Sequence, residues 1–319
     1  MTAQELLNQK QITEHYLGKT KNRLSAFAFV NIFCWRDFFD FDFKVINGNL
    51  CIFARSSMGC FLYLPPLGEF IGRDTIDQCF ALMREINGEA GVTRIENVRE
   101  DQLAFFPRNS FSVYLKSHDF CYYKNDIAAF KGQGYKSKRS SVNQFKANYE
   151  YRYAPYFPSM AEECLALYDD WVVNRHEKYA DDIYRQMLED NRQVHQLIFK
   201  YFKDLGVVGR VVFVNNKIKA YTFGVQIDED MFCSLCEITD LKIAGLAAYI
   251  FQEFCRDPAL EQYKFMNVMD DFELMNIKKT KMSFRPTLLF SSYVVTNANA
   301  KNKVTPAGDA KGGLPPRAT

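Results

Sequence analysis

Two strand–turn–strand segments, one in each half of the chain, constrain the fold more than any other feature. In the first half, apolar residues between 42 and 55 flank an Asn-Gly pair that begins at Asn47, and this pair suits the tight turn of a β-hairpin. In the second half, residues 207–227 repeat the arrangement around an Asn-Asn pair that begins at Asn215. The two hairpins predict antiparallel β-structure in each half, and their similarity is compatible with two copies of one fold.

The residues around the hairpins predict further strands and several helices. Pro65 and Pro66 stop an apolar run in the first half, and Asp74 is a predicted N-cap for the helix that follows. We expect further strands at residues 59–68, 93–98, 110–115, 231–238 and 263–268, the last of which would end the fold. We expect helices at residues 74–88, 159–174 and 182–203 and after Gly245. This order of elements predicts an α+β fold.

The length and composition indicate two ordinary globular domains. A chain of 319 residues is long enough for two domains with a core each, and 48% hydrophobic with 24% charged residues is typical of globular proteins. We place an N-terminal domain at residues 1–125 and a C-terminal domain with the candidate site at 126–296. Residues 297–319 are rich in Gly, Pro, Ala and Asn and contain no aromatic residue, so we expect a disordered tail there.

The sequence shows no sign of secretion, membrane insertion or metal binding. The polar N-terminal residues do not resemble a signal peptide, and no apolar run is long enough to span a bilayer. Nine cysteines without a disulfide-like spacing favour a reducing compartment, so we expect the protein in the cytoplasm. Cys233 and Cys236 form the only C-x-x-C pair, and the four histidines offer no second ligand pair, so we predict packing roles for both cysteines.

Residues 131–153 are the strongest candidate for contact with an anion. They carry six basic residues and one acid, Glu150, although the net charge of the whole chain is only +2. Apolar residues recur at helical spacing from Tyr135 to Tyr149, and a basic helix that begins after a glycine-containing loop is suited to phosphate. A solvated helix face with an ordinary apolar stripe explains these residues equally well. The basic residues are Lys131, Lys136, Lys138, Arg139, Lys146 and Arg152.

Two later segments combine carboxylates with cations. Glu237 and Asp240 lie at the end of a predicted strand beside a helix start, where binding sites often form, and one of them could bind an ammonium group or accept a proton. Asp270 and Asp271, which we expect to end a strand, precede a short helix that Pro286 stops. The lysines of this helix are Lys278, Lys279 and Lys281. The alternatives are a turn acid at Asp240 and ordinary surface ion pairs after it.

No motif for covalent catalysis accompanies these residues. The sequence has no nucleophilic triad pattern, no H-E-x-x-H and no phosphate-binding Walker loop. A positioned substrate, a carboxylate and several cations instead suit direct transfer of a group from a bound, activated donor.

Together these segments resemble a bacterial family, the one named for the C-terminal domain of phosphatidylglycerol lysyltransferases. Residues 236–254 resemble its E-K-A-D…G…Q-x-Q/N-x-E-F stretch, and residues 267–286 resemble N-R-E-E-D-L-G-x-x-G-L-R-K-A-K-x-S-Y-x-P. Residues 33–52 and 64–68 look like its early hairpin region, so the likeness spans roughly residues 20–295. Its pattern K-G-K-x-Y-x-x-K-R-x-x-x-N-x-F is matched by Lys131, Gly132, Tyr135, Lys138, Arg139, Asn143 and Phe145.

The resemblance implies two tandem GNAT-like (acyl-CoA N-acyltransferase-like) domains, each a mostly antiparallel sheet flanked by helices. In membrane relatives, this region moves an aminoacyl group from aminoacyl-tRNA to phosphatidylglycerol. The implied catalytic residues are Glu237, Asp240, Asp271 and Lys281. The implied substrate-binding residues are Lys138, Arg139, Asn143, Asn267, Asp270 and Lys279. No resident cofactor is expected, and the acceptor would be a lipid headgroup, a peptide or a small molecule.

The chain departs from the family pattern beside the implied site. Val268 and Met269 replace an Arg and a Glu, and Glu273 and Asn276 replace two glycines. Three hypotheses follow: a soluble aminoacyltransferase that uses aminoacyl-tRNA, an acyltransferase that uses acyl-CoA, and a binding module whose catalytic site has decayed. The single glycine at Gly245, where a CoA-binding turn usually has several, favours aminoacyl-tRNA over acyl-CoA.

Overall fold

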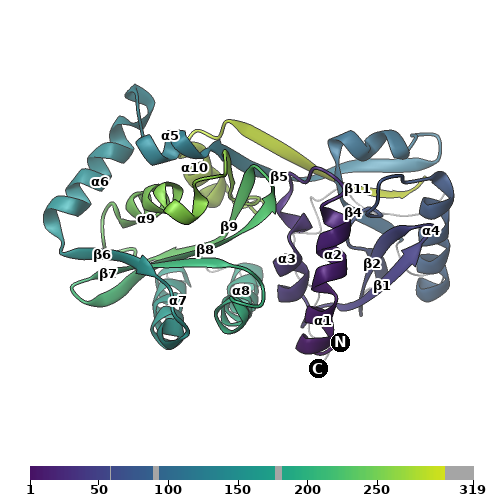
Figure 1. The fold of residues 1–319 in the computed structure, drawn as a ribbon, viewed down its shortest axis with the longest axis horizontal. Coiled ribbons are helices and arrows are strands. Elements are labelled where there is room, and N and C mark those ends of the chain that lie inside the picture. Colours follow the sequence, from purple (N-terminus) through teal and green to yellow (C-terminus); the bar gives the residue numbers. More distant parts are fainter. Residues whose placement is uncertain (58, 89–92, 177–181, 299–319) are drawn as a thin grey trace. The chain divides into compact units, whose positions relative to one another are not determined.

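The computed structural model describes residues 1–57, 59–88, 93–176 and 182–298 (Figure 1). The chain divides into two compact units: the first contains residues 1–119, 270–275 and those from 289 onward, and the second contains residues 120–269 and 276–288. The boundaries predicted at residues 125 and 296 stay predictions. Most of the predicted tail, from residue 299, lies outside the described residues.

The first unit is built on a sheet whose strands follow in the order β1, β2, β3, β4, β11 and β5. Strands β1 and β2 form an antiparallel hairpin, and Asn47 and Gly48 in its turn have φ angles of 50° and 76°, which confirms the predicted turn. Strand β3 runs antiparallel to β2 and parallel to β4. The strands are β1 (Asp40–Ile46), β2 (Asn49–Ser56), β3 (Gly59–Leu62), β4 (Arg94–Arg99), β11 (Leu288–Asn297) and the beginning of β5 (Phe111–Tyr123).

Helix α4 (Arg73–Asn87) connects the parallel strands β3 and β4 and packs its apolar face on the sheet. Ile76, Phe80 and Met83 recur at helical spacing and are buried in the core of this unit. The N-cap is Gly72, so the prediction of Asp74 at that position was wrong; Asp74 lies in the first turn, where its charge suits the helix dipole. The other α-helices described in this unit are α1 (Ala3–Asn8), α2 (Lys10–Leu17) and α3 (Phe29–Cys34).

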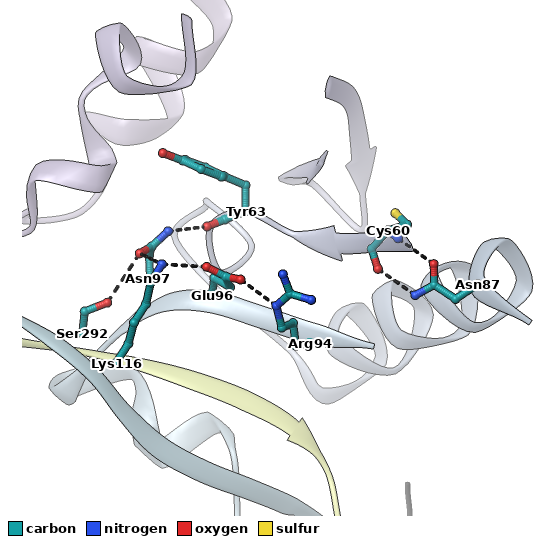
Figure 2. Close-up of polar contacts among 8 residues, drawn as sticks. All are labelled: Cys60, Tyr63, Asn87, Arg94, Glu96, Asn97, Lys116 and Ser292. Atoms are coloured by element: carbon teal, nitrogen blue, oxygen red, sulfur yellow. Dashed lines mark hydrogen bonds and ion pairs between the residues drawn. The ribbon is translucent and has the colours of Figure 1, made fainter. Parts of the chain in front are cut away.

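Strand β4 contains a bulge whose side chains form hydrogen bonds with neighbouring residues (Figure 2). The bulge places Asn97 in the left-handed region, with φ 56°, and its amide donates to the Tyr63 carbonyl oxygen at 2.8 Å. Glu96 accepts hydrogen bonds from Arg94 and Lys116, each at 2.6 Å. Burial alone would raise the pKa of Glu96, but the two cations outweigh it and hold the pKa at about 2.

The second unit is built on a sheet in the order β5, β10, β9, β8, β7 and β6. The β7–β8 hairpin turns at Asn215 and Asn216, which have φ angles of 50° and 61°, so this predicted turn is also confirmed. Strands β9 and β10 are parallel, while β8 is antiparallel to both β7 and β9. The strands are β6 (Tyr151–Pro155), β7 (Val208–Val214), β8 (Lys217–Asp228), β9 (Met231–Thr239), β10 (Phe265–Asn267) and the end of β5.

Helices cover both faces of this second sheet (Figure 1). Helices α7 and α8 pack on one face, and α9 packs on the other together with α5 and α6. The core on the α9 side joins Phe145, Phe251 and Phe254 to sheet residues such as Phe232. The helices are α5 (Lys124–Ala129), α6 (Lys136–Asn148), α7 (Ala161–His176), α8 (Asp182–Tyr201), α9 (Leu246–Arg256) and α10 (Met275–Ser283), which belongs to this unit from Asn276 onward.

The structure adds two strands that the sequence did not predict. Strand β6 follows the basic helix, and β11 follows α10, so the expectation that residues 263–268 form the last strand was wrong. Strand β10 also ends at Asn267, before Asp270 and Asp271, so these aspartates do not end a strand. The predicted helices of the second half correspond to α7, α8 and α9.

Candidate functional site

The candidate site lies where two parallel strands of the second unit separate. Strands β9 and β10 pair from Met231 to Cys233, and the last partner on β10 is Asn267. Strand β9 continues to Thr239, whereas β10 ends at Asn267. The second half of β9 therefore does not pair with β10. Side chains in this part of β9 therefore lie beside an opening in the hydrogen-bonded sheet.

Glu237 lies in the part of β9 that does not pair with β10, and it pairs with Thr222 of β8 on the other side. Its carboxyl makes no hydrogen bond or ion pair with any residue that the structure describes. Burial raises the pKa of Glu237 to about 8. Glu237 is also close enough to Tyr122 and Cys255 to raise the pKa of both side chains, after the larger effect of their own burial. A carboxyl with a pKa near neutrality and no partner is suited to accept a proton from a bound nucleophile.

Lys281 holds the chain just beyond β10. Its ammonium group donates to the backbone carbonyl oxygens of Val268 at 2.6 Å and of Met269 at 3.3 Å. The hydroxyl of Tyr122 donates to the backbone carbonyl oxygen of Lys281 at 2.8 Å. Lys281 therefore holds the backbone at Val268 and Met269, two of the four positions where the sequence departs from the family pattern. Its predicted catalytic role stays a prediction.

Asn267 and Asp240 are likewise engaged in local structure. Asn267 is fully buried, and its side-chain oxygen accepts from the backbone N–H of Met269 at 2.7 Å. Asp240 accepts from the Lys219 ammonium at 2.8 Å and from the backbone N–H of Lys242 at 2.9 Å. Burial raises the pKa of Asp240, but these two bonds outweigh it, so that the pKa is lowered. This geometry matches the turn-acid alternative for Asp240.

The basic helix α6 is tied to α10 at its start. Lys138 donates to the Ser283 hydroxyl at 2.7 Å and lies 3.6 Å above the Phe284 ring, and burial lowers its pKa. Arg139 donates to the backbone carbonyl oxygens of Phe130 and Gly132 and so stabilises the turn that follows α5. Lys138 and Arg139 are thus partly used within the unit, whereas Asn143 is exposed on α6. Contact of these residues with phosphate stays a prediction.

Exposed cations surround this junction of α6 and α10. The Arg285 guanidinium lies directly against Gly134, where any larger residue would collide with it. Five exposed basic side chains at this junction make no hydrogen bond or ion pair with any described residue of the unit. They are Lys131, Lys136, Lys278, Lys279 and Arg285.

Asp270 and Asp271 belong to the first unit. Asp271 accepts from the backbone N–H of Glu273 at 3.1 Å, which stabilises a tight turn. Phe272 and Glu273 in this turn have φ angles of 49° and 58°, a region that favours glycine. The family pattern has a glycine at the position of Glu273, so the structure keeps the backbone conformation that the pattern expects. The site roles predicted for the two aspartates stay predictions.

The start of α9 is closely covered by α6. Gly245 precedes the helix with φ 84°, and a side chain at this position would collide with the backbone carbonyl oxygen of Ser141 in α6. No sequence pattern indicates this contact or the neighbours of Glu237 on β8 and β5, because both depend on how distant segments pack. The alternation of β8 could have placed Thr222 on one face with Ala220, but not opposite Glu237.

Solved structures with similar folds support the predicted architecture. A conserved protein of unknown function from Bacteroides thetaiotaomicron VPI-5482 is 25% identical, with a TM-score of 0.81 over 91% of this chain and 97% of its own. The C-terminal domain of a putative lysylphosphatidylglycerol synthetase from Agrobacterium fabrum is 12% identical, with a TM-score of 0.65 over 94% and 93%. A tandem GNAT protein from the clavulanic acid biosynthesis pathway is 10% identical, with a TM-score of 0.50 over 93% and 97%. No protein with a curated description matches the chain.

These similarities confirm the predicted α+β fold of two tandem GNAT-like domains, which is an aminoacyl- or acyltransferase-like fold. Among the described residues, no helix combines the length and apolarity needed to cross a bilayer. A family model described as "Phosphatidylglycerol lysyltransferase, C-terminal" matches residues 19–295. Because this match covers most of the chain and agrees with the motifs, the chain belongs to the phosphatidylglycerol lysyltransferase C-terminal family.

Proposed function

We propose that the protein transfers an aminoacyl group from aminoacyl-tRNA to an amine or hydroxyl acceptor, with Glu237 as the general base. The observation that carries this proposal is the partly buried carboxyl of Glu237 where β9 and β10 separate, which makes no hydrogen bond or ion pair with any described residue. Family membership and a similar structure described as part of a putative lysylphosphatidylglycerol synthetase support the reaction class. The acceptor is a lipid headgroup, a peptide or a small molecule.

The reaction requires no covalent enzyme intermediate. The acceptor nitrogen or oxygen attacks the carbonyl carbon of the aminoacyl ester and loses its proton to Glu237. The new amide or ester bond forms as the bond to the ribose oxygen of the tRNA breaks, and that oxygen leaves with a proton returned by the carboxyl. A base with a pKa of about 8 is suited to this exchange, because it takes up and releases a proton near physiological pH.

The cations at the junction of α6 and α10 suit a nucleic-acid donor. Lys131, Lys136 and Arg285 are exposed and could contact successive phosphates, while Lys138 lies between the two helices. The nine cysteines are all free thiols, which supports a reducing compartment such as the cytoplasm, where aminoacyl-tRNA is made.

The packing of α6 weighs against acyl-CoA as the donor. A pyrophosphate would need the backbone N–H groups at the start of a helix such as α9. The Ser141 carbonyl oxygen instead lies against Gly245 at this point. The close approach of α6 therefore favours the tRNA version of the reaction.

The test is a transfer assay with radiolabelled aminoacyl-tRNA and a panel of acceptors: phosphatidylglycerol vesicles, short peptides and free amines. We expect Glu237→Gln to lower the rate about 100-fold or more while leaving tRNA binding intact. Glu261→Gln removes an exposed carboxyl of the same unit and should leave the rate unchanged. Salt-sensitive tRNA binding without transfer to any acceptor would instead identify a binding module, and transfer from acyl-CoA alone would refute the proposed donor.

A further inference from the structure

A pocket on the second unit is lined by α7, by the beginning of β8 and by the residues that follow β9, and its lining does not include Glu237. Its volume is about 350 Å³, within the range of pockets that hold small molecules. Leu167 and Trp171 of α7 contribute apolar surface to the lining, and Lys219 of β8 contributes a charged group. Residues 240–242, which follow β9, complete the lining. The pocket therefore combines an aromatic surface with charged groups.

Two of its charged groups neutralise each other. The Lys219 ammonium lies 2.8 Å from an Asp240 oxygen, and the other Asp240 oxygen accepts the backbone N–H of Lys242. This pair fixes the shape of the pocket and leaves no net charge behind. It follows that Lys219 and Asp240 are structural parts of the lining.

The remaining two charges are of opposite sign, and Lys242 also lies near enough to Asp240 to help lower the pKa of that carboxyl. The carboxylate of Asp170 and the ammonium of Lys242 are exposed and line the pocket, and neither forms a hydrogen bond or ion pair with a residue that the structure describes. Asn174 uses its N–H group on the Asp170 carbonyl oxygen at 2.6 Å, which leaves its own oxygen available. A ligand that satisfies both charges must carry a cation and an anion.

The apolar part of the pocket defines the rest of the ligand. Arg175 stacks on Trp171 at 5.0 Å and keeps the indole in place. Val173 and Leu241 line the pocket with 60% and 42% of their surfaces exposed. These residues give an apolar side chain a surface to cover, which would remove both from water.

We propose that this pocket binds a small zwitterion with an apolar side chain, either a free α-amino acid or a short peptide. The ligand's ammonium group contacts Asp170, its carboxylate contacts Lys242, and its side chain packs on Trp171. This site goes beyond the proposed transfer reaction, because its lining does not include Glu237 and its occupation can be measured without any donor.

Tryptophan fluorescence tests the proposal directly. The chain has two tryptophans, and Trp35 belongs to the first unit, so Trp35→Phe leaves Trp171 as the sole reporter. We expect L-leucine at millimolar concentration to change the emission of this variant in a saturable way. N-acetyl-L-leucine lacks the cation and L-leucine amide lacks the anion, so each should bind about tenfold more weakly or not at all. L-alanyl-L-alanine distinguishes a peptide site from a free amino-acid site.

Matched variants assign the two charges. In the Trp35→Phe background, Asp170→Asn and Lys242→Ala should each weaken L-leucine binding about tenfold. Asp204→Asn and Lys217→Ala remove exposed charges outside the pocket and should leave binding unchanged. Thermal melts verify that each variant is folded, and the leucine analogues test the same charges on the unaltered pocket. No saturable response to L-leucine or the dipeptide, equal binding of the blocked analogues, or a response to adenosine monophosphate alone would overturn the proposal.

Discussion

Glu237 should make the chain less stable as the pH rises. Its pKa is about 8 in the folded protein and near 4.5 when unfolded, so between these values the native state binds more protons than the unfolded state. Stability contributed by the protonated carboxyl is present at low pH and declines by up to about 1.4 kcal/mol per pH unit until the pH passes the folded value. Glu237→Gln stays neutral and should lose this decline, as measured by urea unfolding at a series of pH values.

A control and an activity profile complete this test. Glu261→Gln, at an exposed position, should keep the decline of the wild-type protein. The transfer rate of the wild-type protein should rise with pH up to about 8, because only the ionised carboxyl accepts a proton. Parallel stability curves for wild type and Glu237→Gln would show that Glu237 is not buried as described.

The protein should be more stable when glycine replaces Glu273. The φ angle of 58° at Glu273 lies in the left-handed region, where a side chain costs about 1–2 kcal/mol relative to glycine. Glu273→Gly should therefore raise the free energy of unfolding by about 0.5–1 kcal/mol, after the greater freedom of glycine in the unfolded chain is subtracted. Glu273→Ala removes the charge but keeps the side-chain carbon, so it should show no such gain. A gain with alanine as large as that with glycine would mean that the charge, and not the backbone, is unfavourable.

At the level of elements, the packing of α6 on the start of α9 depends on Gly245. Gly245→Ala introduces a left-handed alanine that costs about 1 kcal/mol and a collision with the Ser141 carbonyl oxygen that costs about 1–3 kcal/mol more. Gly48→Ala is the matched control, because Gly48 has a similar φ of 76° but open space around it. Urea unfolding should show a clearly larger loss of stability for Gly245→Ala. Equal losses would contradict the close contact of α6 with α9.

The bulge of β4 should protect the first unit against acid. Glu96 has a pKa of about 2 against 4.5 unfolded, so its ion pairs contribute stability above pH 4.5 that is lost as the pH falls toward 2. Lys116→Met removes one of the two cations in Figure 2 and should raise the pKa of Glu96, which moves the loss of stability to higher pH. The effect should stay below about 3 kcal/mol, because Lys116 is exposed enough for solvent to screen its charge.

An exposed ion pair of the same unit provides the comparison. Lys44 lies 3.1 Å from Asp42, but its side chain is 44% exposed, so Lys44→Met should change stability by less than about 1 kcal/mol. Acid titrations followed by circular dichroism measure both variants. Superimposable acid transitions for wild type and Lys116→Met would show that the bulge does not depend on this pair.

Short sequence patterns correctly predicted the elements that depend only on neighbouring residues, such as the tight turns. The hairpins at Asn47 and Asn215 were correct because these residues accept the left-handed conformation that tight turns need. Strand β6 was missed because Tyr151–Pro155 follows a strong helical signal and ends in a proline that is unusual in strands. Glu237 was identified by its place near a strand end. That it lies beyond the pairing of β9 with β10 could not be predicted, because this depends on the register of two strands that are distant in the sequence.

At the scale of the whole molecule, the charge balance limits how the chain could bind RNA. The net charge is only +2, so long-range attraction to a polyanion is weak, and affinity must come from a local group of cations. Lys131, Lys136 and Arg285 near the start of α6 provide such a group within the second unit. Binding of tRNA should therefore weaken steeply with salt, because each phosphate contact releases condensed counterions.

Charge reversal in this group should change the salt dependence itself. The double variant Lys131→Glu and Arg285→Glu should weaken tRNA binding and reduce the slope of log affinity against log salt by about one for each phosphate that is no longer bound. Lys203→Glu with Lys217→Glu makes the same change in net charge at exposed positions outside the group of cations at the start of α6, and it should leave the slope nearly unchanged. Filter binding at several salt concentrations measures both. An equal decrease in affinity for the two double variants would mean that net charge alone governs binding, and the phosphate contacts predicted for the basic helix would then have no support.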